Sequence, residues 1–476
     1  MERASGVLMH ISSLSGDFGI GSFGTDALHF IDSLRDAGFK WWQVLPFCPV
    51  DECNSPYKSH GSFGGNHYFV DLKMLYEKGL LTKEELEESR QNQPYSCEYE
   101  RLNSERLKIL KKASRRAVNR EEIEEFAASN KYIEEFCTFM ALKEENEYKE
   151  WTKWQKHIPD EDVLFMHKFI QFEFHLQWKE IKEYANSCGI KIIGDIPIYV
   201  SHDSADVWAH RELFLLEEDG SPSRIAGVPP DYFCEDGQLW GNPIYNWEAM
   251  QKDGFKWWMD RMRFMFSMFD GVRIDHFRGI ESYWSVPAEA ETAREGEWKK
   301  GPGIAFVDAL NKVRGENLII AEDLGVITEE VKKLVEYSNF PGMRVFQFGF
   351  LGETNSPHAP HNYTEKTICY TGTHDNNTLL GYVWELSDND RAFMLDYLGF
   401  DGNDWNKCYD NVFRAIYASR APIVLFPIQD LLGYGADTRL NTPGRADGNW
   451  SFRITKDQLN GIDWAKFKKY NRLYGR

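Results

Sequence analysis

The chain has 476 residues, and its 55 lysines and arginines against 74 aspartates and glutamates give a formal net charge of −19. A negative field of this size repels phosphate backbones and anionic lipid surfaces, so we expect no nucleic-acid or membrane partner. Aromatic residues make up 15% of the chain at a mean hydropathy of −0.52, which is typical of a ring-rich, water-soluble protein. No apolar run approaches a membrane span, and the eight cysteines form no Cys-x-x-Cys pair, so we expect free thiols and a cytoplasmic protein.

Short apolar, β-branched runs alternate with segments of helical periodicity along the chain. Eight such runs occur, at residues 6–11, 42–47, 190–195, 271–275, 318–322, 343–348, 367–371 and 422–426. Thr25 and Thr328 are placed to begin two of the intervening helices, and Gly38 to end the first. Eight strands alternating with helices predict an α/β protein with a (β/α)₈ TIM barrel, and a doubly wound open sheet is the alternative.

Two stretches between the predicted strands are too long to be ordinary connections. Residues 73–165, after the second strand, contain the capping-box pattern Thr82-Lys-Glu-Glu85 and a mixed-charge helical stretch at 99–153, so we expect a mainly helical inserted subdomain. Residues 208–246, after the third strand, are rich in glycine, proline and aromatic residues without periodicity, which predicts a long active-site loop. Residues 1–476 as a whole are then one catalytic barrel domain with two insertions.

Acidic residues stand where the predicted strands end. Asp195, Asp275 and Glu322 close the third, fourth and fifth strands, and Asp375 lies four residues beyond the seventh. In a barrel the reacting groups lie at the carboxyl ends of the strands, so these acids are expected at one rim. Each of them alone could instead cap the following helix, but four acids at one rim favour a catalytic site.

The surroundings of two of these acids predict different protonation states. Arg273 and Asp275 lie on the same face of a strand, where the guanidinium keeps the carboxylate ionised and nucleophilic. Glu322 follows the apolar run Leu-Ile-Ile-Ala, which can desolvate it and raise its pKa, as a general acid requires. One ionised and one protonated carboxyl suit glycosyl transfer with retention, and His374 with Asp375 adds a donor and an anion near the sugar.

Two other function classes compete with this interpretation. A metal-dependent hydrolase would draw its ligands from a scattered set, namely His10, Asp195, His210, His276, His374 and Asp375. No His-x-His follows the first strand, and each histidine is more simply explained by hydrogen bonding. A non-catalytic glycan-binding protein would use aromatic platforms alone and would have no reason to place acids at successive strand ends.

Several motifs together resemble a known family. Three segments resemble the catalytic segments of the α-amylase superfamily: Gly271-Val-Arg-Ile-Asp-His-Phe-Arg-Gly279, Ala321-Glu-Asp-Leu-Gly325 and Gly372-Thr-His-Asp-Asn376. Four more narrow the resemblance to glycoside hydrolase family 77, the 4-α-glucanotransferases or amylomaltases: Ser55-Pro-Tyr57, Gly227-Val-Pro-Pro-Asp-Tyr-Phe233, Gly237-Gln-Leu-Trp-Gly-Asn-Pro243 and Pro443-Gly-Arg-Ala446. The resemblance extends over nearly the whole chain.

The resemblance implies a cofactor-free barrel enzyme that transfers α-1,4-glucan segments to the 4-hydroxyl of an acceptor sugar. It implies as partners maltooligosaccharides and starch- or glycogen-derived α-glucans. It makes Asp275 the nucleophile, Glu322 the acid/base and Asp375 the transition-state stabiliser. The substrate contacts that it implies are Tyr57, Asp195, Asp231, Tyr232, Phe233, Gln238, Trp240, Arg273, His276, His374 and Asn441.

One departure from the wider superfamily concerns metals. Amylases usually follow the acid of the third strand with Asn-His, and that asparagine helps hold a structural calcium. This chain has Tyr199 and Val200 in those places, so no metal is expected.

The choice of acceptor rests on the resemblance, because the residues alone do not decide between water and a sugar. The loop at 227–243 offers a physical basis for transfer: Tyr232, Phe233 and Trp240 can cover the glycosyl-enzyme, exclude water and stack on an acceptor. Tyr57 is a second candidate platform. Simple packing of the loop on the barrel is the alternative.

Overall fold

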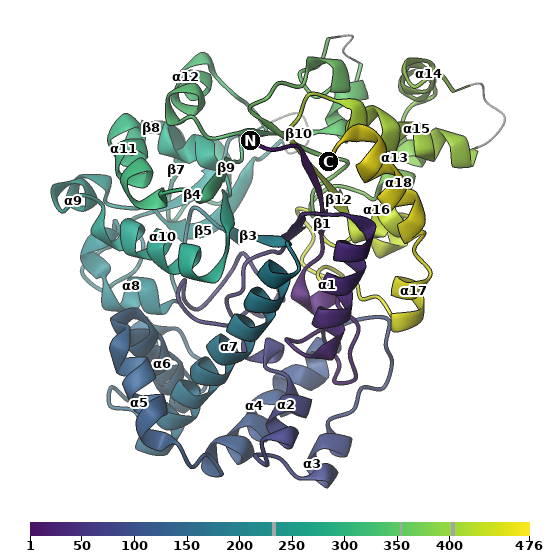
Figure 1. Cartoon of the computed structure of the whole chain (residues 1–476). Coiled ribbons are helices and arrows are strands. Elements are labelled where there is room, and N and C mark those ends of the chain that lie inside the picture. Colours follow the sequence, from purple (N-terminus) through teal and green to yellow (C-terminus); the bar gives the residue numbers. More distant parts are fainter. Residues whose placement is uncertain (231–234, 353–354, 401–404) are drawn as a thin grey trace.

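A closed barrel of eight parallel strands forms the centre of the computed structural model, which describes residues 1–230, 235–352, 355–400 and 405–476 (Figure 1). The strand order around the barrel is β1-β12-β11-β10-β9-β6-β3-β2. Each strand overlaps one of the eight predicted runs, so the predicted (β/α)₈ barrel is confirmed. The strands are β1 Ala4–Leu8, β2 Trp41–Gln43, β3 Lys191–Ile196, β6 Gly271–Ile274, β9 Leu318–Ala321, β10 Gly342–Val345, β11 Thr367–Tyr370 and β12 Ile423–Pro427.

Side chains from alternate strand positions fill the barrel interior. The interior cluster includes Leu8, Ile193, Ile320 and Leu425, all buried. Only glycine fits at position 6, because a Cβ there would come within 2.6 Å of the Leu425 side chain. The barrel is therefore a packed core and not a pore, and chemistry is confined to its ends.

The helices that follow the barrel strands cover its outside. Thr328 caps α12, as predicted, by accepting a hydrogen bond from the Val331 amide, whereas Gly24 and not Thr25 is the N-cap of α1. Gly38 ends α1 in the left-handed conformation. These helices are α1 Thr25–Ala37, α10 Lys256–Met268, α11 Gly303–Arg314, α12 Glu329–Ser338, α13 Leu379–Glu385, α14 Asp388–Tyr397, α15 Trp405–Ala418, α16 Ile428–Leu432, α17 Lys456–Asn460 and α18 Trp464–Tyr474.

A group of helices lies between β2 and β3 and fills the lower part of Figure 1. The predicted capping box of Thr82 and Glu85 is present at the start of α3. The long helix α7 runs back from this group and delivers the chain to β3. Whether 73–165 is a separate subdomain stays a prediction. The helices are α2 Leu72–Glu77, α3 Lys83–Glu88, α4 Tyr99–Arg115, α5 Arg120–Ser129, α6 Lys131–Glu145 and α7 Glu161–Ser187.

Residues 208–246 contain strands, so the expectation of a loop without regular structure is wrong for this segment. Its two strands, β4 Arg224–Val228 and β5 Gln238–Pro243, pair with β7 Ser282–Pro287 and β8 Glu297–Lys300 in an antiparallel sheet of order β5-β4-β7-β8. The strands β7 and β8 come from a distant part of the sequence, and no local hydrophobic periodicity predicts this sheet. Short helices flank the segment, α8 Ala205–Ala209 and α9 Trp247–Lys252.

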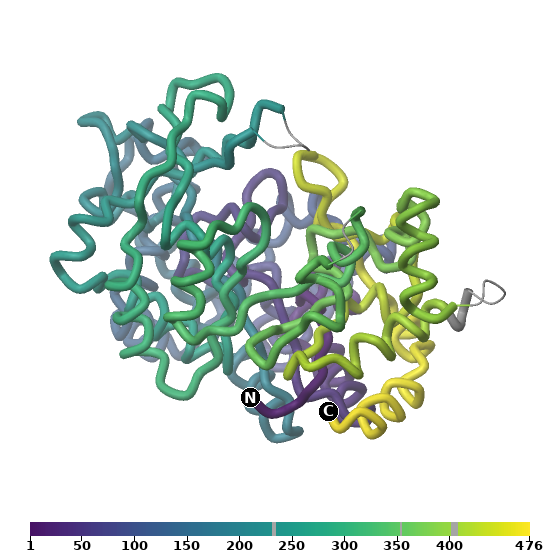
Figure 2. Tube along the Cα trace, turned by 90° about the horizontal axis from the view of Figure 1, so that it is seen from above, coloured from purple at the N-terminus to yellow at the C-terminus, as the bar shows by residue number. Residues whose placement is uncertain are grey.

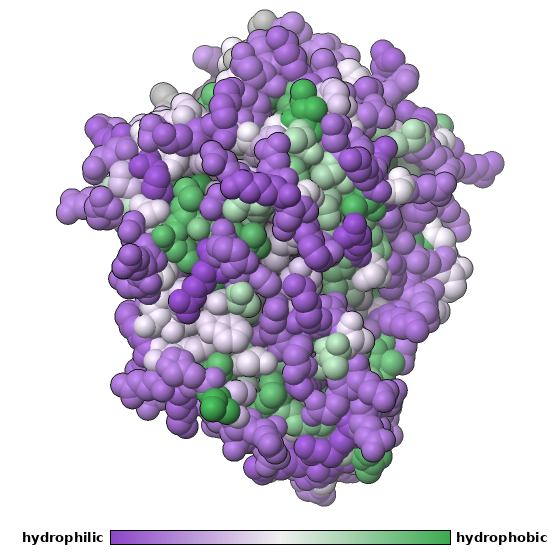
Figure 3. Space-filling model, turned by 90° about the vertical axis from the view of Figure 1, so that its left-hand side faces the viewer, coloured by the Kyte–Doolittle hydropathy of each residue, from purple (hydrophilic) through white to green (hydrophobic). Residues whose placement is uncertain are grey.

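This sheet stands on the side of the barrel opposite the chain termini (Figure 2). Hydrophilic side chains dominate the face in Figure 3, and apolar side chains form small separate patches on it. No helix among the described residues is long and apolar enough to cross a membrane. The seven cysteines within the described residues are all free thiols.

Candidate active site

The four predicted acids lie at or just beyond the carboxyl ends of four barrel strands, of which β3, β6 and β9 are neighbours. Asp195 lies on β3 and is paired with Arg273 of β6, Asp275 follows β6, and Glu322 follows β9. Asp375 lies in the connection between β11 and α13. Because the strands are parallel and in register, their ends deliver these side chains to one rim of the barrel.

Arg273 connects two of the acids. Its Nη1 donates to Asp195 Oδ2 at 2.6 Å and its Nη2 to Asp275 Oδ1 at 2.5 Å. Burial lowers the pKa of this guanidinium, but the two carboxylates outweigh burial and raise the pKa well above its ordinary value. Arg273 is thus a permanent cation that keeps the Asp275 carboxylate oriented by a charge-assisted hydrogen bond, as its position on the strand predicted.

Asp195 lies beneath the rim, with a fully buried side chain. Its Oδ2 also accepts the Tyr57 hydroxyl at 2.7 Å, and its Oδ1 has no hydrogen-bond partner among the described residues. Burial raises the pKa of this carboxyl against the opposing effect of Arg273. Asp195 therefore positions Tyr57 and Arg273, and a direct contact with a sugar stays a prediction.

Glu322 is a buried carboxyl that takes up a proton more readily than an ordinary glutamate. Burial and the nearby Asp275 raise its pKa to about 7, against the effects of Arg273 and of two backbone amides. The amides are those of His276, at 2.7 Å from Oε2, and Leu324, at 2.8 Å from Oε1. The pKa is shifted in the direction that the preceding apolar run predicted.

His276 turns the chain so that its amide reaches Glu322. Its φ of 51° lies in the left-handed region, which a residue other than glycine occupies only under strain and often at functional sites. Its imidazole meets the Trp240 ring edge to face at 4.9 Å, and burial lowers its pKa to about 4, so it is neutral. Trp240 Nε1 donates to Gln238 Oε1 at 3.2 Å on the same strand, which places both β5 side chains beside the rim.

His374 stacks on Tyr57, with ring centroids 4.9 Å apart and planes at 16°. Its Nε2 lies 3.3 Å from Asp375 Oδ2. Burial lowers the pKa of His374, but Asp375 outweighs burial and the net shift is upward. One face of Tyr57 is thus covered by His374, so a sugar can meet only the remaining surface of this ring.

Asp375 is held by several donors. Asn441 Nδ2 donates to its Oδ1 at 2.6 Å, and Arg439 Nη2 donates to its backbone carbonyl at 2.5 Å. Desolvation by itself would raise the pKa of Asp375, but His374 and Asn441 hold it at about 2. Asp375 is therefore an anion at any pH near neutrality.

Three predicted residues lie outside the part of the chain that the structure describes, and two residues of the site were not predicted. Asp231, Tyr232 and Phe233 lie outside the described residues. Arg439 and the buried Trp450, whose ring lies 5.8 Å from His374 at 35°, belong to the site without having been predicted. Both flank the quoted motif at 443–446 within one irregular segment, so the signal was only their closeness to Asn441.

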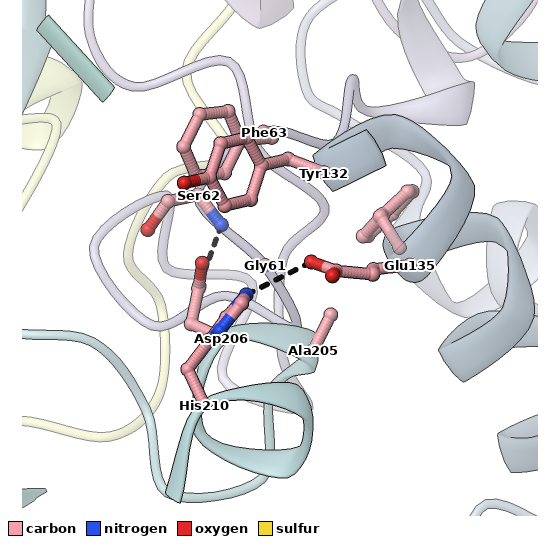
Figure 4. A pocket seen from close by; sticks show the side chains of 9 residues that line it. Gly61, Ser62, Phe63, Tyr132, Glu135, Ala205, Asp206 and His210 are labelled. Carbon is pink, nitrogen blue, oxygen red and sulfur yellow. Dashed lines mark hydrogen bonds and ion pairs between the residues drawn. The ribbon is translucent and has the colours of Figure 1, made fainter. Parts of the chain in front are cut away.

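The histidines of the metal-hydrolase alternative are dispersed. His210 lies in a separate small pocket, where its Nε2 is 2.9 Å from Glu135 (Figure 4). His10 accepts the Leu45 amide through Nδ1 and is held neutral by burial, which lowers its pKa to about 3. Within the described ranges, no three His, Cys, Asp or Glu side chains are grouped to hold a metal ion.

Comparisons with known proteins agree with this geometry. Residues 9–459 match the family model described as 4-alpha-glucanotransferase, glycoside hydrolase family 77. The 4-alpha-glucanotransferase of Synechocystis sp. is 42% identical over 100% of this chain and 98% of its own length, and that of Streptococcus pneumoniae is 43% identical over 96% and 94%.

A solved structure extends the match to three dimensions. The amylomaltase from Streptococcus agalactiae in complex with acarbose is 38% identical, covers 100% of both chains and has a TM-score of 0.95. The amylomaltase from Corynebacterium glutamicum, at 16% identity and a TM-score of 0.82, shares the fold. The barrel, the acids at its rim and these matches lead to one conclusion: the chain belongs to the 4-α-glucanotransferase family, glycoside hydrolase family 77.

Proposed function

We propose that the acids at the barrel rim transfer α-1,4-glucan segments from a donor glucan to the 4-hydroxyl of an acceptor by double displacement. The observation that carries the assignment is the contrast between two carboxyls. Asp275 receives a hydrogen bond from the permanent cation Arg273 at 2.5 Å, whereas the pKa of Glu322 is about 7. One group is thus equipped to attack and the other to donate a proton.

In the first step the Asp275 carboxylate attacks the anomeric carbon of the donor sugar. The glycosidic bond breaks, and its oxygen takes the proton of Glu322, so the departing fragment leaves with a free 4-hydroxyl. A covalent glycosyl ester forms on Asp275 with inverted configuration. Arg273 orients the attacking carboxylate during this step.

In the second step the acceptor reverses the chemistry. The acceptor 4-hydroxyl attacks the same anomeric carbon while the Glu322 carboxylate takes its proton, and the ester bond to Asp275 breaks. The second inversion restores the α configuration, and both carboxyls return to their starting states. Water competes with the acceptor at this step and would give hydrolysis.

Asp375 and His374 act on the sugar in both transition states. Positive charge develops on the sugar ring as the bond to the anomeric carbon breaks, and the Asp375 anion stabilises that charge. His374 donates to a ring hydroxyl from its fixed position on Tyr57. Trp240, Gln238 and the predicted pair Tyr232 and Phe233 form the neighbouring sugar sites.

The substrates that we assign are α-1,4-linked oligosaccharides. The bound acarbose in the Streptococcus agalactiae amylomaltase supports an oligosaccharide as the ligand at the barrel rim of this chain. We narrow the class to maltooligosaccharides and to glucans derived from starch or glycogen. We place the enzyme in the cytoplasm, a proposal that the free, partly buried thiols support.

The product pattern from pure maltotriose tests this function. Transfer predicts glucose together with a ladder of longer glucans, resolved by chromatography. Hydrolysis alone would yield only glucose and maltose and would overturn the assignment of a sugar acceptor. Asp275→Asn enzyme serves as the control for contaminating activity.

A further inference from the structure

One buried carboxylate, Asp430, is bonded to both ends of the loop that carries His374 and Asp375. Asp430 lies in α16, directly after β12. Its Oδ2 accepts the Thr371 hydroxyl at 2.5 Å, and its Oδ1 accepts the Leu379 amide at 2.8 Å. Thr371 follows β11 and Leu379 begins α13, so this one side chain fixes the distance between the two ends of the loop.

An ion pair does not account for the buried carboxylate of Asp430. The residue has 0% exposure, and no ion pair among the described residues includes it. The titratable group that packs on it is Tyr409 of α15, whose hydroxyl donates to the Asp430 backbone carbonyl at 3.0 Å. Burial raises the pKa of Asp430 to about 6. Burying a carboxylate without an ion pair is unfavourable unless hydrogen bonds compensate, and both oxygens of Asp430 accept theirs from the ends of the loop.

The residue next to Asp430 contacts the segment that leads to Arg439, and Arg439 in turn contacts the loop. Gln429 Nε2 donates to the Thr438 carbonyl at 3.1 Å, just before Arg439, whose guanidinium bonds the Asp375 carbonyl. The segment from α16 to Asn441 thus contacts Asp375 through Arg439 and Asn441. Asp430 is the most buried residue of this segment that contacts the loop.

We propose that Asp430 is a positioning residue for glucan transfer: by fixing both ends of the loop 371–378, it sets the place of Asp375 relative to the sugar. It is fully buried, so it acts through the loop and touches no substrate. The inference rests on the role proposed above for Asp375.

Asp71 provides a matched control. It is also a buried carboxylate that accepts one hydroxyl, from Ser22 at 2.6 Å, and one helix amide, from Met74 at 2.9 Å. It caps α2, in the helical part of the chain, and it takes no part in the site described above. A loss of the same two hydrogen bonds can therefore be compared inside and outside the catalytic loop.

The first measurement compares kcat and KM for maltotriose disproportionation. We expect Asp430→Ala to lower kcat about 100-fold with KM within about twofold, because small displacements of a catalytic group have effects of that size. Asp71→Ala should leave kcat within about twofold at a similar loss of Tm. A kcat for Asp430→Ala that matches Asp71→Ala would overturn the inference.

If Asp430→Ala does not fold, two milder variants replace it. Asp430→Asn and Thr371→Val each remove only part of the contact, and an unchanged kcat in both variants would also overturn the inference.

A double-mutant cycle decides whether Asp430 acts through Asp375. Turnover of α-maltosyl fluoride is measured for Asp375→Asn, Asp430→Ala and the double variant. We expect Asp430→Ala to slow the Asp375→Asn enzyme by less than about threefold, because residues that act as a unit are not additive. A full additional 100-fold loss would overturn the inference. If Asp375→Asn alone retains full turnover, the proposed role of Asp375 fails, and that result is distinct from a failure at Asp430.

Discussion

Asp275 is the residue that we propose as the nucleophile of the covalent step. Replacing it by Asn keeps the shape of the side chain but removes the oxygen that forms the glycosyl ester. We expect a loss of kcat of about 1000-fold or more on maltotriose, in the range seen for lost nucleophiles. Arg273 keeps its bond to Asp195 in this variant, so Tm should change little.

The control for this substitution is Asp388→Asn, at an acid whose side chain is fully exposed on α14. Its kcat should equal that of the parent enzyme. An Asp275→Asn enzyme with activity within tenfold of the parent would remove Asp275 from the nucleophile role.

Glu322 sets the pH dependence expected for the first step. The step needs the protonated form of a group whose pKa is about 7, so kcat/KM for maltotriose should fall as pH rises through about 7. Fluoride leaves without protonation, so the rate of glycosyl-enzyme formation from α-maltosyl fluoride should lack this basic limb. Glu322→Gln should lose maltotriose activity but keep formation of the intermediate from the fluoride. A basic limb that is identical for both donors would assign the proton to another group.

The barrel strands could be predicted from sequence because each is a short apolar run buried on both faces. Their ends were less certain: the second strand stops at Gln43, and the predicted strand at 343–348 gives way to a 3₁₀ helix at Phe346. The sheet of β4, β5, β7 and β8 was missed because its two local strand pairs, β4 with β5 and β7 with β8, are joined by the β4–β7 pairing, which links distant segments. Pairing of that kind leaves no signal in a local window.

The place of the four acids at one rim was predictable for the same reason as the strands, since a strand end fixes where its last side chain points. Arg439, Trp450 and Asp430 were not predicted. They act through contacts between β11, β12 and the segments after them, and those contacts exist only once the barrel is closed. Sequence therefore indicates which acids lie at the rim, while the groups that hold them depend on the fold.

The segment that joins β4 and β5 should decide between sugar and water at the second step. Tyr232 and Phe233 are predicted to stack on the acceptor, at about 0.5–1.5 kcal/mol for each ring. Replacing both by Ala should shift the partition toward hydrolysis by about thirtyfold for a total near 2 kcal/mol. Both reactions share the glycosyl-enzyme, so its formation cancels in their ratio, which is measured from glucose release and ladder formation.

Tyr76 and Tyr95, two exposed rings in the helical part of the chain, are the matched control for that double variant. Their replacement by Ala should leave the ratio of transfer to hydrolysis unchanged. If the Tyr232 and Phe233 variant slows both reactions equally, the rings serve donor binding or loop packing instead of acceptor binding.

At the scale of the whole molecule, the net charge of −19 should have little effect on substrate binding, because α-glucans are neutral. We expect kcat/KM for maltotriose to change less than about twofold between low and high salt, since no charged ligand is steered to the cleft. The active-site charges are arranged in close, partly buried pairs that salt screens weakly. A strong decline with salt would point to an ionic substrate or to a dependence on surface charge.

Metal removal is the test that separates this molecule from the metal-dependent class. The place where amylases carry the calcium-binding asparagine is occupied by Tyr199, which packs against Tyr245 with ring centroids 5.9 Å apart, and by the buried Val200. Aromatic and aliphatic side chains provide none of the oxygen ligands that calcium needs. In the proposed mechanism, Arg273 and Glu322, whose pKa is about 7, supply the charge and the proton that a catalytic metal would otherwise provide. We therefore expect exhaustive dialysis against EDTA to leave both kcat on maltotriose and Tm unchanged.

Two outcomes would contradict this expectation. If dialysis removes activity and one particular metal restores it, the proposed carboxylate mechanism is incomplete. If dialysis lowers only Tm, a structural ion is bound elsewhere in the fold.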